Sequence, residues 1–112
     1  MIRDVHQEKQ VTVIVLEGSL EVGKQEKLKD DLLKQVPPSD PRLVLDFSGV
    51  DFIDSACLGA LVGLARRLRE TGGDVKIASP TPEVKSIFQI TRLDRLFEVF
   101  ATKEAAVSSY MK

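Results

Sequence analysis

Apolar runs and helix-like repeats alternate along this chain. Residues 11–16 (V-T-V-I-V-L) are β-branched and nearly all apolar, which predicts a strand buried on both faces, broken at residues 17–21. Residues 43–47 predict a second buried strand, and the alternating residues 74–78 predict a third. Residues 96–100 (L-F-E-V-F) predict a short final strand. The polar start of the chain, with its scattered apolar positions, predicts only a poor edge strand.

Segments with helical spacing lie between these strands. Residues 21–36 predict a first helix, which a proline-rich stretch ends. A second helix starts near Ser55 and stops at the glycines of residues 71–73. Its apolar face is formed by Leu58, Leu61, Val62, Ala65 and Leu68. Thr81 and Thr102 are expected to cap two further helices. Strands that alternate with helices predict an α/β fold with a mostly parallel sheet.

The segment that leads from the second buried strand into the second helix organises the chain. A short turn with Ser48 and Gly49 is expected after the strand, and D-S-A-C-L-G at residues 54–59 then opens the helix. Ser55 is a favoured N-cap residue, because its hydroxyl can accept a hydrogen bond from an unpaired backbone N–H of the first turn. This pattern puts a small hydroxyl residue at a helix N-terminus just beyond a strand. We take it as the candidate functional site.

Length and composition narrow the class of protein. The chain has 112 residues, 43% of them hydrophobic and 29% charged, which fits a single globular domain over residues 1–112. Its formal net charge of −1 gives no basic excess for binding nucleic acid or an anionic membrane. The sequence has no transmembrane run and no signal-peptide pattern. One cysteine cannot form an internal disulfide, so we expect a cytoplasmic protein.

Candidate catalytic groups are sparse. A nucleophilic Ser55 needs a general base and an orienting acid, and the single histidine, His6, stands in the weak N-terminal segment. The sequence has no G-x-S-x-G elbow, no P-loop or dinucleotide glycine motif, and no Cys/His cluster for zinc. We therefore expect no enzymatic activity, no cofactor and no metal. A generic nucleotide-binding domain is disfavoured because the chain offers no phosphate cradle.

Four segments resemble a known family. They are L-E-G-S-L-E at residues 16–21, V-L-D-F-S-G-V-D-F-I-D-S-A-C-L-G at 44–59, G-G-D-V-K-I-A at 72–78, and P-E-V-K-S-I-F-Q-I-T-R-L-D-R-L-F at 82–97. Over nearly its whole length, the chain resembles the STAS domain of bacterial anti-sigma factor antagonists. The resemblance implies a four- to five-stranded, mostly parallel mixed sheet with about four helices packed largely on one face.

The resemblance also implies a regulatory function. In that family, the serine after the aspartate is phosphorylated by a kinase that is also the anti-sigma factor. The unmodified antagonist binds this kinase and frees the sigma factor, and a separate serine phosphatase removes the phosphate. Carried over to this chain, the phosphorylated residue is Ser55. The implied partner-binding residues are Asp54, Ser55, Ala56, Cys57, Leu58, Gly59, Gly18, Ser19 and Glu21.

Several readings stay open from the sequence. Ser55 can be only a helix cap, in a non-switching STAS subunit that acts as a scaffold or as the partner of a transporter. Cys57, where the family usually has glycine, can be a small residue with an unreactive thiol or a reactive thiol at a helix N-terminus. Gly59 and Gly63 can bring their helix close to the sheet or form a flat docking surface. The intact Asp-Ser pair favours the switch, for which a monomer is expected. The sequence does not identify the sigma factor, the kinase or the phosphatase.

Overall fold

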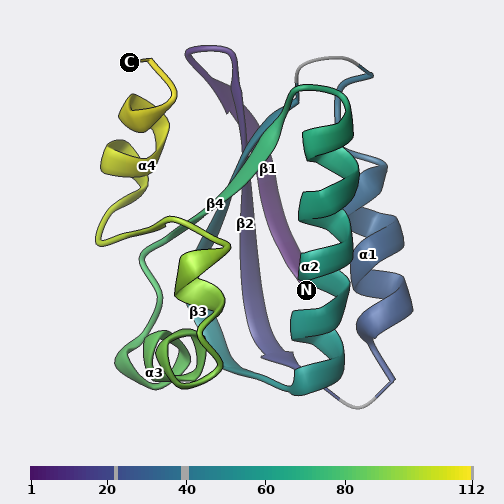
Figure 1. The fold of residues 1–112 in the computed structure, drawn as a ribbon, viewed down its shortest axis with the longest axis vertical. Helices are drawn as coiled ribbons and strands as arrows, with labels where there is room; N and C mark the ends of the chain where they lie inside the picture. Colours follow the sequence, from purple (N-terminus) through teal and green to yellow (C-terminus); the bar gives the residue numbers. More distant parts are fainter. Residues whose placement is uncertain (22, 39–40, 112) are drawn as a thin grey trace.

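The computed structural model describes residues 1–21, 23–38 and 41–111, and its strands form one mixed sheet (Figure 1). The elements in chain order are β1 (Ile2–Glu8), β2 (Val11–Leu20), α1 (Gln25–Leu33), β3 (Arg42–Ile53), α2 (Ser55–Glu70), β4 (Asp74–Ala78), α3 (Pro82–Ile90), the 3-10 helix η1 (Leu93–Arg95), β5 (Val99–Phe100) and α4 (Lys103–Ser109). The sheet order is β1-β2-β3-β4-β5. Strand β1 is antiparallel to β2, and the other neighbours are parallel, so the predicted α/β fold with a mostly parallel mixed sheet is confirmed.

Strands β2 and β3 are longer than their apolar runs predict. The expected break after residue 16 is wrong, because β2 continues to Leu20 with irregular pairing around Gly18, whose φ is +85°. The expected turn at Ser48 and Gly49 is also wrong, because β3 runs on to Ile53. The two strands pair with each other in parallel to their ends, with Leu20 opposite Ile53. Backbone pairing therefore extends both strands through residues that are poor strand formers by themselves.

Other boundaries differ by smaller amounts. Helix α1 begins at Gln25 rather than at residue 21, and part of its predicted start, Val22, lies outside the described residues, as do residues 39–40 of the proline-rich stretch. Strand β5 keeps only Val99–Phe100 of the predicted residues 96–100. Phe97 instead packs inward on Phe88, with ring centroids 5.9 Å apart. Core packing thus replaces strand pairing at the start of that segment.

The predicted N-caps of α3 and α4 and the predicted glycine stop after α2 are confirmed. The hydroxyls of Thr81 and Thr102 accept hydrogen bonds from the backbone N–H groups of Val84 and Ala105, so they cap α3 and α4. Helix α2 ends at Glu70, and Gly72, which follows the C-cap Thr71, adopts a φ of +84°. The N–H of the residue after it, at position 73, donates to the Leu68 carbonyl at 2.9 Å, which is the Schellman arrangement.

Helices α1, α2 and α3 cover one face of the sheet, which we call the front face; α1 and α2 lie side by side along it (Figure 1). The front core is a continuous set of buried apolar side chains from all three helices and from β2, β3 and β4. Phe47 and Phe88 stack edge to face in it, with ring centroids 6.0 Å apart. This core fixes the position of α2, whose N-terminal turn follows β3 directly.

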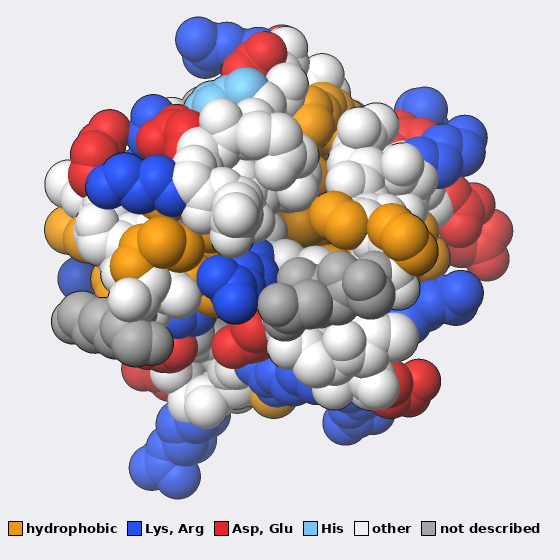
Figure 2. All heavy atoms as spheres, turned by 90° about the horizontal axis from the view of Figure 1, so that it is seen from above, with side chains coloured by type: hydrophobic (Ala, Val, Ile, Leu, Met, Phe, Trp, Pro, Cys, Tyr) orange, Lys and Arg blue, Asp and Glu red, His pale blue; other side chains and the backbone are white. Residues whose placement is uncertain are grey.

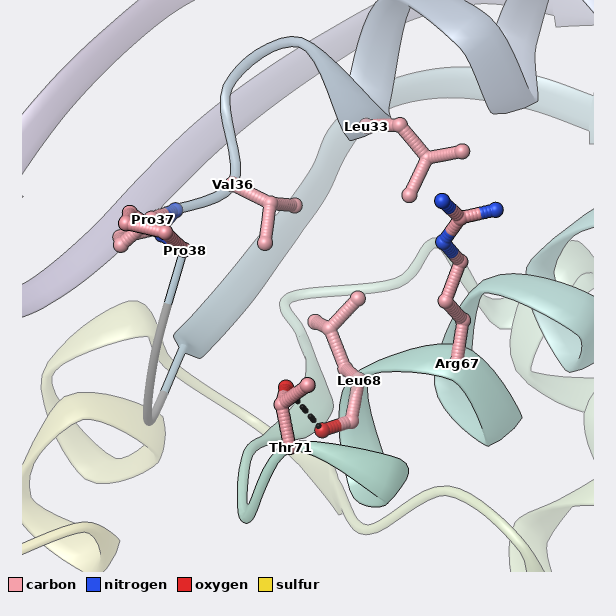
Figure 3. A pocket seen from close by; sticks show the side chains of 7 residues that line it. All are labelled: Leu33, Val36, Pro37, Pro38, Arg67, Leu68 and Thr71. Atoms are coloured by element: carbon pink, nitrogen blue, oxygen red, sulfur yellow. Dashed lines mark hydrogen bonds between the residues drawn. The ribbon is translucent and has the colours of Figure 1, made fainter.

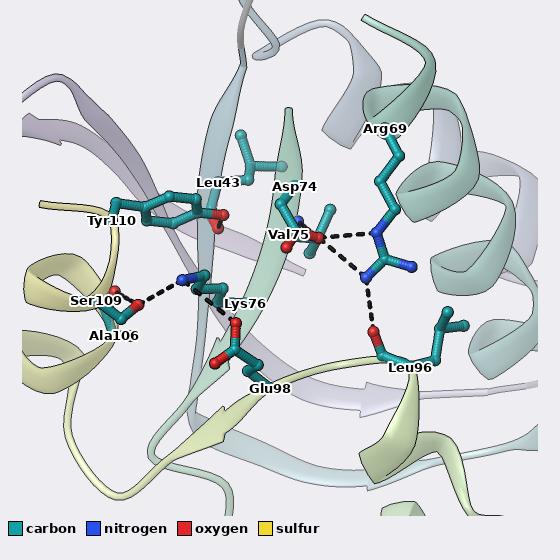
Figure 4. Close-up of polar contacts among 10 residues, drawn as sticks. All are labelled: Leu43, Arg69, Asp74, Val75, Lys76, Leu96, Glu98, Ala106, Ser109 and Tyr110. Carbon is teal, nitrogen blue, oxygen red and sulfur yellow. Dashed lines mark hydrogen bonds and ion pairs between the residues drawn. The ribbon is translucent and has the colours of Figure 1, made fainter. Parts of the chain in front are cut away.

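Helix α4 covers the opposite, back face of the sheet over a small cluster that includes Val13 and Val44. Lys76 of β4, only 7% exposed, projects into this layer (Figure 4). Its ammonium lies 2.6 Å from the Ser109 hydroxyl, 3.4 Å from Glu98 and 4.2 Å from the ring centroid of Tyr110. The Tyr110 hydroxyl donates to the carbonyl of Leu43 at 2.8 Å. Polar contacts therefore tie α4 to the sheet, and three of the four described α-helices remain on the front face.

Candidate functional site

The N-cap of α2 is Asp54, not Ser55. The Asp54 backbone is extended, and its carboxylate accepts a hydrogen bond from the backbone N–H of Cys57 at 2.9 Å. The expectation that Ser55 is the N-cap is therefore wrong, because the helix begins one residue earlier than that role requires. Ser55 is the first residue of the helix and is exposed. Among the described residues, its hydroxyl forms no hydrogen bond, so it is available to a partner or an enzyme.

The parallel pairing of β2 and β3 brings the end of β2 to the start of α2. Gly18 pairs with Val50, and Ser19 pairs with Phe52. The backbone N–H of Asp54 donates to the Leu20 carbonyl at 3.0 Å, which ties the two strand ends together. The structure thus brings Ser19 and Leu20 of β2 beside the end of β3 and the N-cap of α2, whereas Gly18 lies opposite Val50, earlier in β3. The contact role that the resemblance implies for Gly18, Ser19 and Glu21 stays a prediction. A basic group also lies at this edge, since the ammonium of Lys24 donates a hydrogen bond to the Ser19 carbonyl at 2.9 Å.

The side chains of Cys57 and Leu58 do not belong to the exposed surface. Cys57 is fully buried and Leu58 is 4% exposed, because both face the front core. These two members of the implied partner-binding set can act only by supporting the helix. Burial and a hydrogen bond to Asp54 raise the pKa of the Cys57 thiol to about 11, so the reading as a reactive thiol with a lowered pKa is wrong. The side chain of Cys57 also leaves the approach to Ser55 open, although the family usually has glycine there.

The outward side of the first turns of α2 is made of very small residues. Ser55, Ala56 and Gly59 are all exposed. A Cβ atom added at Gly59 would meet nothing within 4 Å, so packing against the sheet does not require this glycine. At Gly63, an added Cβ atom would lie 3.1 Å from the Lys29 ammonium, so that glycine lies against α1 instead. A glycine in a helix interior costs about 1 kcal/mol relative to alanine, and the fold gains nothing in return at Gly59.

Phe52 is a candidate contact residue that the sequence analysis missed. Its side chain is 42% exposed at the end of β3, paired with Ser19 and two residues before the N-cap. Large exposed apolar side chains beside small residues are typical of protein contact surfaces. A signal existed in the sequence: if the strand is extended to Ile53, the neighbouring Phe52 points to the other side of the sheet.

The titratable groups of the N-terminal strand lie elsewhere. His6 contacts Asp4 at 2.7 Å and Glu8 at 2.6 Å, and Glu8 also contacts Lys103 of α4 at 2.7 Å. The Glu8 and Asp4 carboxylates raise the pKa of His6. Within the described ranges no group of three or more His, Cys, Asp or Glu residues could hold a metal ion, and no helix there is long and apolar enough to cross a membrane.

Comparison with known proteins identifies the family. The model of the STAS domain matches residues 3–106. The protein BtrV of Bordetella bronchiseptica, whose name describes it as an anti-sigma factor antagonist, is 30% identical over 98 residues, which cover 88% of this chain and 84% of BtrV. The chain belongs to the STAS-domain family of anti-sigma factor antagonists.

Solved structures of STAS proteins share the fold described here. TM1081 of Thermotoga maritima, which is described as an anti-sigma factor antagonist, superposes with a TM-score of 0.88 at 21% identity, and the match covers 97% of this chain and 94% of that chain. The antagonist SpoIIAA in its unphosphorylated form gives a TM-score of 0.78 at 23% identity, covering 96% and 95% of the two chains. The phosphorylated form of SpoIIAA from Bacillus gives 0.69 at 22% identity, covering 96% and 97%. At these identities, the likeness establishes the STAS fold alone.

Proposed function

We propose that this STAS protein is a phosphorylation-controlled partner switch. In this proposal it binds a serine-kinase anti-sigma factor while Ser55 is unmodified and is released when that kinase phosphorylates Ser55. A serine phosphatase then restores the binding form. The supporting observation is the division of roles at the start of α2: Asp54 caps the helix, and the exposed hydroxyl of Ser55 is uncommitted among the described residues. The existence of SpoIIAA in unphosphorylated and phosphorylated forms supports the same reading.

A phosphate on Ser55 is compatible with the fold. It adds about −1.5 to −2 charges, which a helix N-terminus favours by up to ~2 kcal/mol. Repulsion from the neighbouring Asp54 opposes this by roughly 1–3 kcal/mol per charge pair at about 6 Å, for an effective dielectric of about 20–80. Ser55 is exposed, so the effective dielectric lies near the upper value, where the repulsion from the whole phosphate charge is roughly 1–2 kcal/mol and nearly offsets the helix effect. The modified chain therefore stays folded. A partner that covers Ser55 would have to desolvate the phosphate, and affinity therefore falls much more than stability.

Small side chains around Ser55 suit this function. The exposed Ala56 and the open space above Gly59 let a partner approach the helix backbone closely. Phe52 and the end of β2 around Ser19 supply apolar and backbone contacts beside it. We therefore assign the partner surface to Phe52, Ser55, Ala56 and Gly59 together with residues Gly18, Ser19 and Glu21.

The modification is tested first by intact mass spectrometry of the protein from its own cells, followed by site mapping. One phosphate on Ser55 is expected. The Ser55→Ala variant should lose the added mass, whereas Ser86→Ala, which removes an exposed serine on α3, should keep it. A parent chain that stays unmodified with candidate kinases and ATP would overturn the switch.

Release of the partner is tested with Ser55→Asp and the matched Ser86→Asp variant. Ser55→Asp should remain folded by circular dichroism and lose more than a hundredfold in affinity for the kinase, which corresponds to ~3 kcal/mol. Ser86→Asp should bind like the parent. Equal binding by Ser55→Asp and the parent would favour the alternative function, a non-switching STAS subunit of a larger assembly.

A further inference from the structure

A groove lies between the C-terminal halves of α1 and α2, distant along α2 from Ser55. It consists of two adjoining hollows that share Arg67 and Thr71. The first, of about 270 Å³, has apolar walls from both helices and from the chain after α1. The second, of about 460 Å³, is lined by basic side chains and by the backbone at Gly63. We call these two hollows together the α1–α2 groove.

The apolar hollow is shaped to receive a side chain. Leu33, Val36 and Leu68 point toward a common centre, with Pro37 and Pro38 closing one side (Figure 3). Leu68 is almost fully buried, while Leu33 and Val36 remain partly exposed. The guanidinium of Arg67 stands at the rim, over the hollow (Figure 3). An apolar side chain that enters here would remove water from these leucine and valine surfaces.

The basic hollow carries positive charge that the fold itself does not use. In the described part of the chain, the side chains of Lys29, Arg66 and Arg67 form no hydrogen bond or ion pair, whereas Arg69 of the same helix is bound to Asp74 and to a backbone carbonyl. Glu70 also lines the hollow, so three cations face one carboxylate. The helix dipole favours basic residues in the last turn of α2, but it does not explain why Lys29 of α1 joins them.

Small residues keep this charge accessible. The Lys29 ammonium lies close over Gly63, where a side chain would occupy its place, since an added Cβ atom would be 3.1 Å from it. Viewed from the side at which α1 and α2 end, the surface shows exposed hydrophobic side chains with basic and acidic side chains around them (Figure 2). Ser55, Gly59 and Gly63 are spaced four residues apart, so one outward stripe of α2 joins the Ser55 surface to the groove.

We propose that the α1–α2 groove binds an acidic segment of a partner protein, whose carboxylates meet Lys29, Arg66 and Arg67 while a neighbouring apolar side chain enters the hollow at Leu33, Val36 and Leu68. The apolar hollow selects a peptide over a nucleic acid, because the groove lining contains no aromatic side chain for a base to stack on. The inference goes beyond the proposed switch and does not require that Ser55 accept a phosphate.

The test uses short synthetic peptides and the full chain. The probe has glutamates flanking one leucine; its controls replace the glutamates by glutamine, or the leucine by alanine. Titration of the ¹⁵N-labelled protein should shift the amide signals of Leu33, Gly63, Arg67 and Thr71, and both control peptides should bind more weakly. Arg67→Glu and Lys29→Glu should each lower the affinity for the acidic peptide about tenfold, and added salt should lower this affinity further.

The control variant is Lys85→Glu, which makes the same charge change at an exposed site on α3 and should bind like the parent. Equal binding of the acidic peptide to parent, Arg67→Glu and Lys29→Glu would overturn the proposal. Signal shifts confined to other elements would overturn it as well. So would tighter binding of a single-stranded oligonucleotide than of the acidic peptide. None of these outcomes bears on phosphorylation of Ser55, so the two proposals fail separately.

Discussion

The two faces of the sheet are covered in different ways. On the front face, α1, α2 and α3 bury one continuous apolar core. On the back face, α4 covers a cluster of six buried residues in the described part of the chain and is held by Lys76, Tyr110 and the ion pair between Lys103 and Glu8. The front face therefore carries most of the hydrophobic stabilisation. The back face depends on a few directional contacts, which are worth about 1 kcal/mol each.

The residues that stabilise the fold are therefore different from the exposed residues that we assign to partner binding. The α1–α2 groove and the Ser55, Ala56 and Gly59 part of the Ser55 surface lie on the outer side of the front-face helices, and the rest of that surface lies at the ends of β2 and β3. The rigid core beneath them holds the contact residues in place without using their exposed side chains. Changes on the back face should therefore loosen α4 while leaving partner binding intact.

The largest expected effect comes from the front core. Leu61→Ala removes a fully buried side chain of α2 and should lower the free energy of unfolding by about 3 kcal/mol, through lost burial and a residual cavity. Val107→Ala on the back face should cost about half as much, because fewer buried methyl groups are removed. Urea denaturation checks both values. Equal losses would mean that Val107 lies in a site as tightly packed as that of Leu61, despite its smaller side chain.

A gain in stability is expected at the Ser55 surface. Gly59→Ala should raise the free energy of unfolding by about 1 kcal/mol, since the new methyl group meets open space and alanine favours the helix. The same change should lower the affinity for the kinase partner, because the new methyl group lies on the proposed contact surface. Ser86→Ala, at an exposed site on α3 away from both proposed surfaces, is the control and should bind the kinase like the parent. If Gly59→Ala binds the kinase as tightly as the parent, Gly59 does not belong to the partner-contact surface.

Loss of one polar contact should loosen the back face alone. Tyr110→Phe removes the hydrogen bond to the Leu43 carbonyl and should cost about 1 kcal/mol. Amide hydrogen exchange should become about fivefold faster in α4, with no change in α2. An equal acceleration in both helices would show that the two faces open as one unit.

The smallest effect concerns pH. Hydrogen bonds to Glu8 and Asp4 raise the pKa of His6 above 6.5. The stabilisation from protonated His6 is therefore complete below pH 6.5 and is lost as the pH rises through the raised value. The difference in melting temperature between the parent and His6→Gln should shrink over that rise. Because His6 is partly exposed, the effect should be smaller than that of Tyr110→Phe. A pH-independent difference would contradict the ion-pair role.

Sequence patterns predicted the elements whose signal is local. The strand at residues 74–78 and the threonine caps of α3 and α4 follow from alternation, burial and cap chemistry alone. The ends of β2 and β3 could not be predicted, because their pairing with each other carries polar residues such as Glu17 and Asp51 into the sheet. The choice between Asp54 and Ser55 as N-cap depended on that strand end, since both residue types cap helices well.

The sequence indicated which segment forms the candidate site, but not which of its side chains are exposed. The D-S-A-C-L-G segment follows from the strand-to-helix pattern, and the Gly18–Glu21 stretch follows from the resemblance; the binding role of both stays a prediction. Which side chains face outward required the structure, because Cys57 and Leu58 turn into the core while Phe52 turns out. The α1–α2 groove had no signal in the sequence, since Lys29 and Arg67 meet only through packing of two helices that are far apart in the chain.

The reactivity of the buried Cys57 thiol can be used to measure local opening of the structure. It is the single cysteine of the chain, and its pKa of about 11 keeps it a thiol at neutral pH. Alkylating reagents attack the thiolate, so they react with the native chain only when the first turn of α2 lifts from the sheet. The alkylation rate thus measures how often this turn opens. A fluorophore can be placed on any newly introduced surface cysteine while the native thiol stays unlabelled.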